Sequence, residues 1–326
     1  MPTKSYAFAV GNVRAKEAGL LKKQDIEQLL SSDNVMEAAN FLKDKGFGYA
    51  DTPLDAEALL KDEEQKLWEY VASVAPDLSV FEAFTVENDF HNIKAVFKGT
   101  FMGVEYKHLL LKPALAQINS IEKAAGEQDF SALPEEYREV AKKAYEALVK
   151  GADPQLCDAL LDAACQETRL KAAENAKIPM LSEIIRATVF FGSIKAAIRC
   201  ARAKKNKAFC ETSISGTDIF DKKTLVNAAL KGIDEVLTLL GSASKYRGAE
   251  AAQAYKESPS AFEKFADDFI MSVVVKAKYI AVGAEPLIAY LQAKLTEIKV
   301  ARMVINGIAT MEDNTKIREM LRELYG

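Results

Sequence analysis

A short apolar segment containing one lysine occurs three times along this chain. The copies read Phe90-His-Asn-Ile93-Lys94-Ala-Val96, Phe191-Gly-Ser-Ile194-Lys195-Ala-Ala197 and Leu295-Thr-Glu-Ile298-Lys299-Val-Ala301. The three lysines recur at intervals of about one hundred residues, which is too long for a solenoid repeat and typical of a domain. The repeat therefore predicts three related units in tandem.

Each copy has the spacing of a helix with one apolar face. Apolar residues lie four and one positions before the lysine and two positions after it, so they share a face, and the lysine lies at its border. A second cation follows about one turn later. Two interpretations remain open: the long side chains extend along the helix edge into water, or three equivalent helices surround a common axis and present cations to an acidic partner.

The second copy leads into a cationic run. Six cations and no acid lie between Lys195 and Lys207, toward the expected end of a helix, where the helix dipole favours positive charge. A solvated helix end and a contact with an acidic protein surface or with lipid headgroups both fit this pattern. The candidate partner-binding residues are the cations Lys94, Lys195, Arg199, Arg202, Lys299 and Arg302.

Composition and helix signals favour an all-α fold. Apolar residues make up 49% of the 326 residues, whereas Gly and Pro number only 16 and 9. No alternating run is long enough to predict a strand. An apolar stripe over 137–149 predicts a helix, and Asp153 followed by Pro154 predicts the start of the next one.

Two further helix limits are expected near the C-terminal end. Ser260 and Glu263 have the spacing of a capping box, which predicts a helix start at Ser260. A later helix is expected to begin at Pro286 and to stop at Asn306-Gly307, because glycine often follows the last turn of a helix.

The charge balance and the apolar stretches exclude several classes of protein. With 43 basic and 47 acidic residues the net charge is −4, which argues against a general nucleic-acid binder. The chain starts without the apolar core of a secretion signal, and its longest apolar stretches fall short of the roughly 20 residues that span a bilayer. We therefore expect a chain without a membrane span.

Catalytic and ligand-binding motifs are missing from the sequence. There is no phosphate-binding loop, no dinucleotide-binding glycine turn, no H-E-x-x-H pair and no nucleophile elbow. The four cysteines form no C-x-x-C pair, and the chain has two histidines, so no metal site is expected. We predict no catalytic, cofactor-binding or metal-binding residues. A helical enzyme using distant carboxylates stays open as an alternative.

Four segments resemble one known family. They are Tyr6-Ala-Phe8-Ala-Val-Gly-Asn12-Val-Arg14-Ala15 with Leu20-Leu21, then Asp89-Phe90-His91-Asn92-Ile93-Lys94, then Gly283-Ala-Glu285-Pro286-Leu-Ile-Ala289-Tyr290, and finally Glu297-Ile298 and Arg302 with the end of the chain over 317–325. In this order they resemble the C subunits of the V/A-type ATPases and ATP synthases, which are relatives of the d subunit of eukaryotic V-ATPases. Residues 112–178 match poorly, and Ala284 stands where the family often has proline.

The resemblance implies an all-helical, funnel-like protein of three similar helical-bundle domains around a pseudo-threefold axis, with a central hollow. With the repeat, it places the domains at 1–111, 112–215 and 216–326. It also implies a non-catalytic rotor subunit without cofactor, which joins the central shaft (the D and F subunits) to the membrane rotor ring on the cytoplasmic face and transmits torque for proton or sodium transport. A cytosolic helical scaffold unrelated to ion transport is the alternative.

Overall fold

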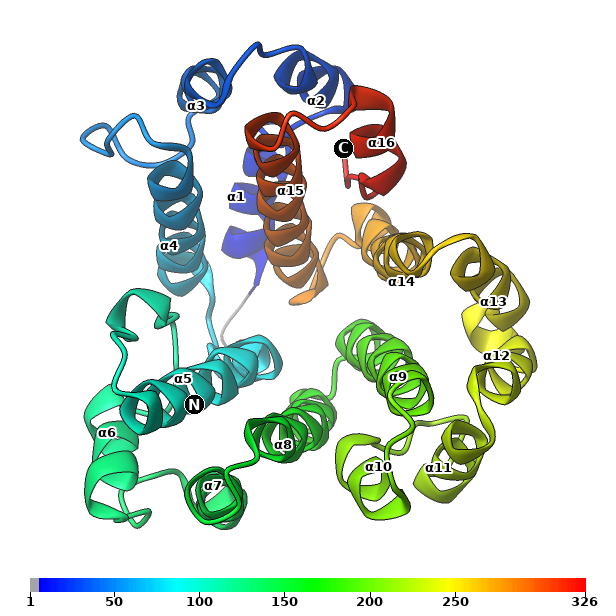
Figure 1. Cartoon of the computed structure of the whole chain (residues 1–326). Coiled ribbons are helices and arrows are strands. Elements are labelled where there is room, and N and C mark those ends of the chain that lie inside the picture. Colours follow the sequence, from blue (N-terminus) through cyan, green and yellow to red (C-terminus); the bar gives the residue numbers. More distant parts are fainter. Residues whose placement is uncertain (1–5) are drawn as a thin grey trace. The chain divides into compact units, whose positions relative to one another are not determined.

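The computed structural model describes residues 6–326, and within this range the chain forms helices and turns but no strand (Figure 1). The all-α prediction is thereby confirmed. The helices form two compact units: unit 1 runs up to Leu78 and resumes at Gln253–Gly326, and unit 2 is Ser79–Ala252. Unit 1 is thus built from both ends of the chain. The three-domain division at 1–111, 112–215 and 216–326 follows the repeat and stays a prediction.

Unit 1 is organised around one long helix, α15. Its helices are α1 (Ala7–Glu17), α2 (Lys23–Leu30), α3 (Val35–Asp44), α4 (Ala56–Val74), α14 (Pro259–Val274), α15 (Glu285–Ala309) and α16 (Asn314–Met320), with a 3₁₀ turn at Val275–Tyr279. α15 contacts each of the other six (Figure 1). Because its side chains are mostly apolar or small all the way round, α15 is buried on most of its circumference.

Unit 2 is organised around α8, which packs against α5, α7, α9 and α10. Its helices are α5 (Glu82–Met102), α6 (Ile118–Glu127), α7 (Glu135–Val149), α8 (Pro154–Ala176), α9 (Pro179–Arg202), α10 (Lys207–Ser213), α11 (Lys222–Lys231) and α12 (Ile233–Gly241). Short 3₁₀ turns occupy Ser79–Phe81, Lys107–Leu109 and Ser244–Tyr246, and α13 (Gly248–Glu257) crosses the boundary between the units. The core of unit 2 is rich in aromatic rings, such as Phe90 against Tyr137 with ring centroids 4.9 Å apart.

The start of α8 and the stripe of α7 agree with the sequence analysis. α7 buries Tyr137, Ala141, Ala144 and Leu148 on one face, which confirms the expected stripe up to Leu148, whereas Val149 at the end of the helix is exposed. The side chain of Asp153 accepts a hydrogen bond of 2.9 Å from the backbone N–H of Leu156, and Pro154 is the first residue of α8. Asp153 thus satisfies one of the free N–H groups at the helix start, as its position predicted.

The expected start at Ser260 is wrong. α14 begins at Pro259, and the capping side chain is Ser258, whose hydroxyl oxygen accepts a hydrogen bond of 2.9 Å from the N–H of Ala261. Proline at the first helical position already has the backbone angle of a helix and needs no N–H partner there. Pro259 therefore makes Ser258 the capping residue, although Ser260 has the spacing of a capping box.

The expected stop at Asn306-Gly307 is also wrong, because α15 continues to Ala309. Gly307 has a packing role instead: a Cβ atom at this position would lie 2.4 Å from Cδ1 of Ile317, a fully buried residue of α16. The glycine therefore lets α16 lie close against α15, and tertiary packing outweighs the local stop signal.

Candidate functional site

The three repeated segments lie on three long helices, α5, α9 and α15. The apolar positions before and after each lysine are buried, apart from Leu295, which is partly exposed. This confirms the predicted apolar face. Lys195 and Lys299 are exposed at its border, and Lys94 is half-buried there.

In the first copy, two lysines form a ladder with two aspartates of the neighbouring helix. The ammonium of Lys94 pairs with Asp162, and Lys98 Nζ lies 2.6 Å from Asp158 Oδ2. Both the lysines on α5 and the aspartates on α8 are spaced by one helical turn, so the two rows face each other. Because all four side chains are partly exposed, each pair contributes only about 0.2–1 kcal/mol to stability.

In the third copy, the cations are paired within unit 1. Lys299 Nζ lies 2.6 Å from Asp267 Oδ2 on α14, and Arg302 Nε lies 3.3 Å from Glu57 Oε1 on α4. These pairs join α15 to two of its neighbours. The candidate residues Lys94, Lys299 and Arg302 therefore have intramolecular carboxylate partners, whatever further partner they bind.

The second copy groups its cations on one helix. Lys195, Arg199 and Arg202 are all exposed on the C-terminal half of α9, and the cationic run continues through Lys204 to Lys207 at the start of α10. Within this run, Lys207 Nζ lies 3.7 Å from Glu211 Oε1, one turn further along α10. The structure thus brings three of the six candidate residues together on one helix.

A feature that the sequence analysis missed lies two positions before each repeated lysine. Here each copy has a buried polar residue: Asn92, Ser193 or Glu297. Each is tied to a separate segment: Asn92 Oδ1 accepts the N–H of Leu111 at 2.8 Å, Ser193 donates to Gln166 Oε1 at 3.2 Å, and Glu297 Oε2 accepts the N–H of Leu21 at 2.6 Å.

The shared register of these three polar residues within apolar segments was the signal that could have revealed them. Buried polar groups that are hydrogen-bonded fix a single arrangement of the segments they join. The repeated helix is therefore a helix that anchors other parts of the chain.

The Asp89-Phe90-His91-Asn92 segment holds the loop between α5 and α6. Asp89 is fully buried and accepts hydrogen bonds from the Ala116 N–H at 2.8 Å and from the Tyr137 hydroxyl at 2.9 Å. Asn88 donates to the carbonyl of Pro113 at 2.8 Å. Burial raises the pKa of Asp89, and its two donors oppose that shift. These contacts explain why the segment carries the polar residues Asp89 and Asn92.

In unit 1 the corresponding stretch of α15 carries a buried ion cluster. Lys294 Nζ lies 2.8 Å from Glu63 Oε1 and also pairs with Glu297. Burial raises the pKa of Glu297 in spite of this cation, whereas the pKa of Glu63 lies below its usual range because Lys294 and Lys66 outweigh the effect of its burial. Two carboxylates likewise outweigh burial and raise the pKa of Lys294.

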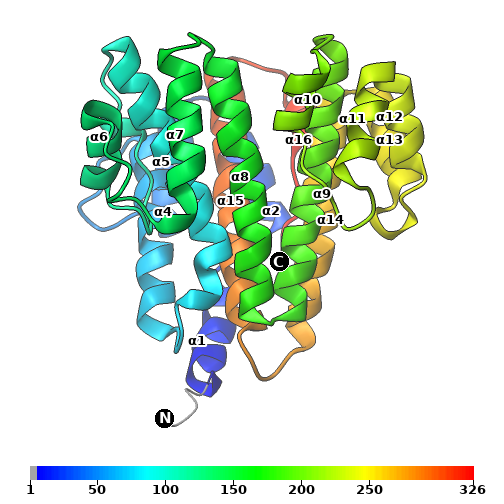
Figure 2. The same cartoon turned by 90° about the horizontal axis from the view of Figure 1, so that it is seen from below.

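The start of α1 and the loop before α15 lie at the same end of unit 1, the lower end in Figure 2. They expose three large apolar side chains, Phe8 (70% exposed), Tyr279 (89%) and Val282 (74%), which we call the apolar tip. Arg14 supports the loop, because its guanidinium donates to the carbonyls of Ala277 and Ile280, both at 2.8 Å. Exposed apolar groups held on a fixed backbone are typical of an interaction surface.

Within the described part of the chain, the structure adds no metal centre or membrane segment to these surfaces. Over residues 6–326, no three His, Cys, Asp or Glu side chains are grouped so that they could hold a metal ion. Over the same range no helix is both long enough and apolar enough to cross a membrane. The features that stand out are buried anchors, exposed cations and an apolar tip.

These features define an all-helical protein whose long repeated helices anchor other segments. Residues 9–320 match the ATP synthase (C/AC39) subunit family, and the chain belongs to this family. It is also similar to the C subunit of a V-type sodium ATPase from Enterococcus hirae, with 24% identity over 318 residues that cover 96% of this chain and 97% of the relative. The family resemblance seen in the sequence is confirmed.

Proposed function

We propose that this chain is a non-catalytic central-stalk subunit of a V/A-type ATPase or ATP synthase. It joins the central shaft, formed by the D and F subunits, to the membrane rotor ring and transmits torque during proton or sodium transport. The observation that carries the proposal is the family match over residues 9–320. The name of the Enterococcus hirae relative supports the same kind of complex.

The anchors within each unit suit a mechanical role. A coupling subunit has to resist shear, and closely packed helices with filled cores are stiff. In unit 1 the cluster of Glu63, Lys294 and Glu297 resists sliding between α4 and α15, and in unit 2 Asp89 and Asn92 keep the loop after α5 in place. Such contacts pass a load from one helix to the next without a change of conformation.

The repeated cations bind acidic groups of the shaft in this proposal. They are Lys94, Lys195, Arg199, Arg202, Lys299 and Arg302. The exposed part of α9 contributes most, because three of the six lie there. The proposal keeps three tandem domains around a pseudo-threefold axis, with a central hollow for the tip of the shaft.

The apolar tip contacts the membrane rotor ring in this proposal. Phe8, Tyr279 and Val282 offer apolar area that is costly to leave in water, and the ring subunits offer a partner that is itself apolar. The chain is then peripheral, on the cytoplasmic face of the membrane, and held there by protein contacts.

Reconstitution with and without this chain tests the proposal. A complex assembled without it should still hydrolyse ATP in its head, but should no longer move ions into vesicles. Adding the purified chain should restore ion transport. Ion transport that is unchanged without the chain would contradict the proposal and favour the scaffold alternative.

Charge reversal on α9 tests the shaft contact separately. The triple variant Lys195→Glu, Arg199→Glu and Arg202→Glu should weaken binding to purified D and F subunits by about tenfold or more, because attraction becomes repulsion. The matched control is Lys150→Glu, an exposed lysine outside the repeated helices. Isothermal titration calorimetry gives both affinities, and equal affinities in folded proteins would remove α9 from the proposed interface.

A further inference from the structure

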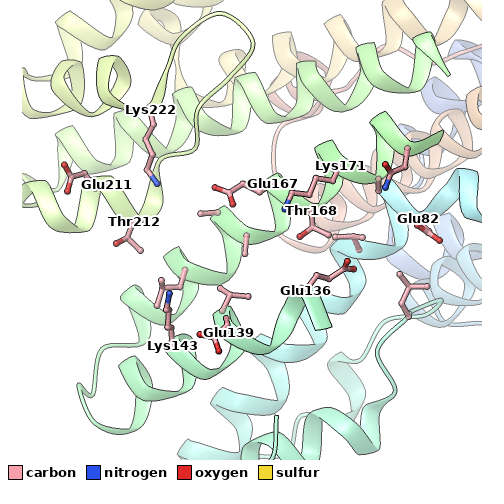
Figure 3. Close-up of a pocket in the computed structure, with 18 residues that line it drawn as sticks. Glu82, Glu136, Glu139, Lys143, Glu167, Thr168, Lys171, Glu211, Thr212 and Lys222 are labelled. Atoms are coloured by element: carbon pink, nitrogen blue, oxygen red, sulfur yellow. The ribbon is translucent and has the colours of Figure 1, made fainter. Parts of the chain in front are cut away.

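A groove of about 520 Å³ lies on the surface of unit 2, along α8 between α7 and α10 (Figure 3). All of its lining residues belong to unit 2. In Figure 3, Glu167, Thr168 and Lys171 of α8 lie in the middle of the groove. Glu136 and Glu139 of α7 lie on one side of them, and Glu211 and Thr212 of α10 lie on the other. The features described above make no use of this groove.

The floor of the groove is one face of α8, on which small apolar side chains lie beside polar ones such as Glu167, Thr168 and Lys171. α8 contributes Ala163, Ala164 and Ala172, and Leu160 lies on the same face one turn before Ala163 and Ala164. Helices approach to an interaxial distance of about 8–10 Å, depending on the size of the side chains between them. A face rich in alanine, flanked by two other helices, therefore accommodates a further helix at close range. Leu115, 48% exposed, adds an apolar wall.

The rim of the groove is charged, with an acidic excess. Its acidic members are Glu82, Glu136, Glu139, Glu167 and Glu211, and its basic members are Lys143, Lys171 and Lys222. Glu136, Glu139 and Glu167 are exposed, and the acidic members outnumber the basic ones by five to three. Their negative field is thus available to a partner, and it opposes nucleic acid, phosphate and other anions.

We propose that this groove binds a cationic amphipathic helix of a partner protein. The apolar face of that helix packs onto the alanines of α8, and its Lys or Arg side chains reach the glutamates on both walls. This is the recognition mode in which an amphipathic helix lies in a groove with anchors at i, i+3, i+4 and i+7. The acidic rim selects the partner by charge, and the narrow floor selects it by shape.

A synthetic peptide provides the probe. We would use a fluorescent peptide of leucine and lysine, about five helical turns long, with all leucines on one face. Its binding to the full chain is measured by fluorescence anisotropy. A peptide of the same composition in scrambled order and a peptide with glutamate in place of lysine are the ligand controls. The amphipathic cationic peptide should bind at least about tenfold more tightly than either control.

Variants of the protein locate the bound peptide. The double variant Glu139→Lys and Glu167→Lys should weaken peptide binding about tenfold or more, whereas Glu127→Lys, on the exposed side of α6, should change it less than about twofold. Ala164→Phe fills the floor without changing charge and should also weaken binding. Circular dichroism confirms that each variant is folded.

Three results would overturn the proposal. Equal binding of the scrambled peptide would show that the peptide binds only through general attraction between opposite charges. Binding unchanged by the groove variants would place the peptide elsewhere. Sedimentation that shows a dimer, lost on introducing Glu139→Lys and Glu167→Lys, would assign the groove to a second copy of this chain.

Discussion

Lys294 Nζ lies 2.8 Å from Glu63 Oε1 and so joins α15 to α4 inside unit 1. Glu297, one turn further along α15, is the second carboxylate partner of the same ammonium. Both carboxylates also accept backbone N–H groups, from Gly48 at 3.0 Å and from Leu21 at 2.6 Å. Lys294, with Lys66 beside Glu63, therefore neutralises a cluster that holds two helices and two connecting segments.

Removal of that lysine should destabilise unit 1 strongly. Lys294→Met leaves the buried carboxylate of Glu297 without a cation and leaves Glu63 with Lys66 alone, which costs about 3–5 kcal/mol of unfolding free energy. The single tryptophan of the chain, Trp68, lies on α4 and reports urea unfolding of this unit by fluorescence. The matched control is Lys299→Met, whose ammonium is half exposed beside Asp267 and should cost less than about 1 kcal/mol. Equal costs for the two variants would refute the special role of the buried cluster.

Asp25 should contribute stability that depends on pH. Its carboxylate accepts the N–H of Lys22 at 2.8 Å at the start of α2 and pairs with Lys45 at 2.5 Å. The hydrogen bond from Lys45 is the largest cause that lowers the pKa of Asp25. A lowered pKa means that the contribution is present above the ordinary Asp value of 3.8 and is lost as the pH falls through the folded-state pKa.

Asp25→Asn should therefore cost about 0.5–1 kcal/mol at neutral pH and almost nothing at a pH well below the ordinary value for Asp. Urea unfolding of both proteins across this pH range, followed by Trp68 fluorescence, measures the difference. Lys45→Met should reduce the pH-dependent part, because the pKa of Asp25 then returns toward its ordinary value. A difference that stays constant with pH would contradict the assignment.

Asn92→Leu should release the loop between α5 and α6. The side chain of Asn92 both accepts from the N–H of Leu111 at 2.8 Å and donates to its carbonyl at 3.0 Å, and leucine can do neither. The loss leaves partly buried backbone groups of Leu111 unpaired, at a cost of about 1–3 kcal/mol. Hydrogen exchange followed by mass spectrometry should show faster exchange over 103–116.

The matched control for this loop is Asn227→Leu, at an exposed position of α11. It makes the same chemical change without removing the anchor, so exchange over 103–116 should stay as in the native protein. If both variants accelerate exchange there to the same extent, Asn92 is not what holds the loop.

Gly307→Ala should destabilise the packing of α16 on α15. The added Cβ would fall 2.4 Å from Ile317 Cδ1, and this side chain is fully buried and has little room to move. We expect a cost of about 1–3 kcal/mol in thermal unfolding followed by circular dichroism. Gly126→Ala is the control: nothing lies within 4 Å of its added Cβ, and alanine at this position of α6 should stabilise the helix by up to about 1 kcal/mol. Stabilisation by both substitutions would show that Gly307 is not needed for close approach.

Much of the helical structure could be predicted because its causes are local. The stripe over 137–149 and the pair Asp153-Pro154 act within one or two turns, and both predictions are confirmed, the stripe as far as Leu148. The prediction at Gly307 is wrong because the reason for this glycine lies in α16, which no local pattern reveals. The prediction at Ser260 is wrong because two capping signals overlap and proline decides between them.

The anchoring sites could be predicted only in part. The spacing of the repeat identified the buried face of each helix, but it could not identify the segment that meets that face. Glu297 and Leu21 are 276 residues apart, and their hydrogen bond follows from the tertiary fold. The groove along α8 escaped the sequence analysis for the same reason, since its walls come from helices that adjoin only in the folded unit.

The order in which the ribosome makes the chain has a consequence for unit 1. Its first four helices leave the ribosome early, but α15, the helix that they pack against, is synthesised only after all of unit 2. Domains generally fold as they emerge, so unit 2 can be complete while the apolar faces of α1–α4 still lack their partner. Nascent chains that stop before α15 should therefore need chaperones to keep these faces from aggregating.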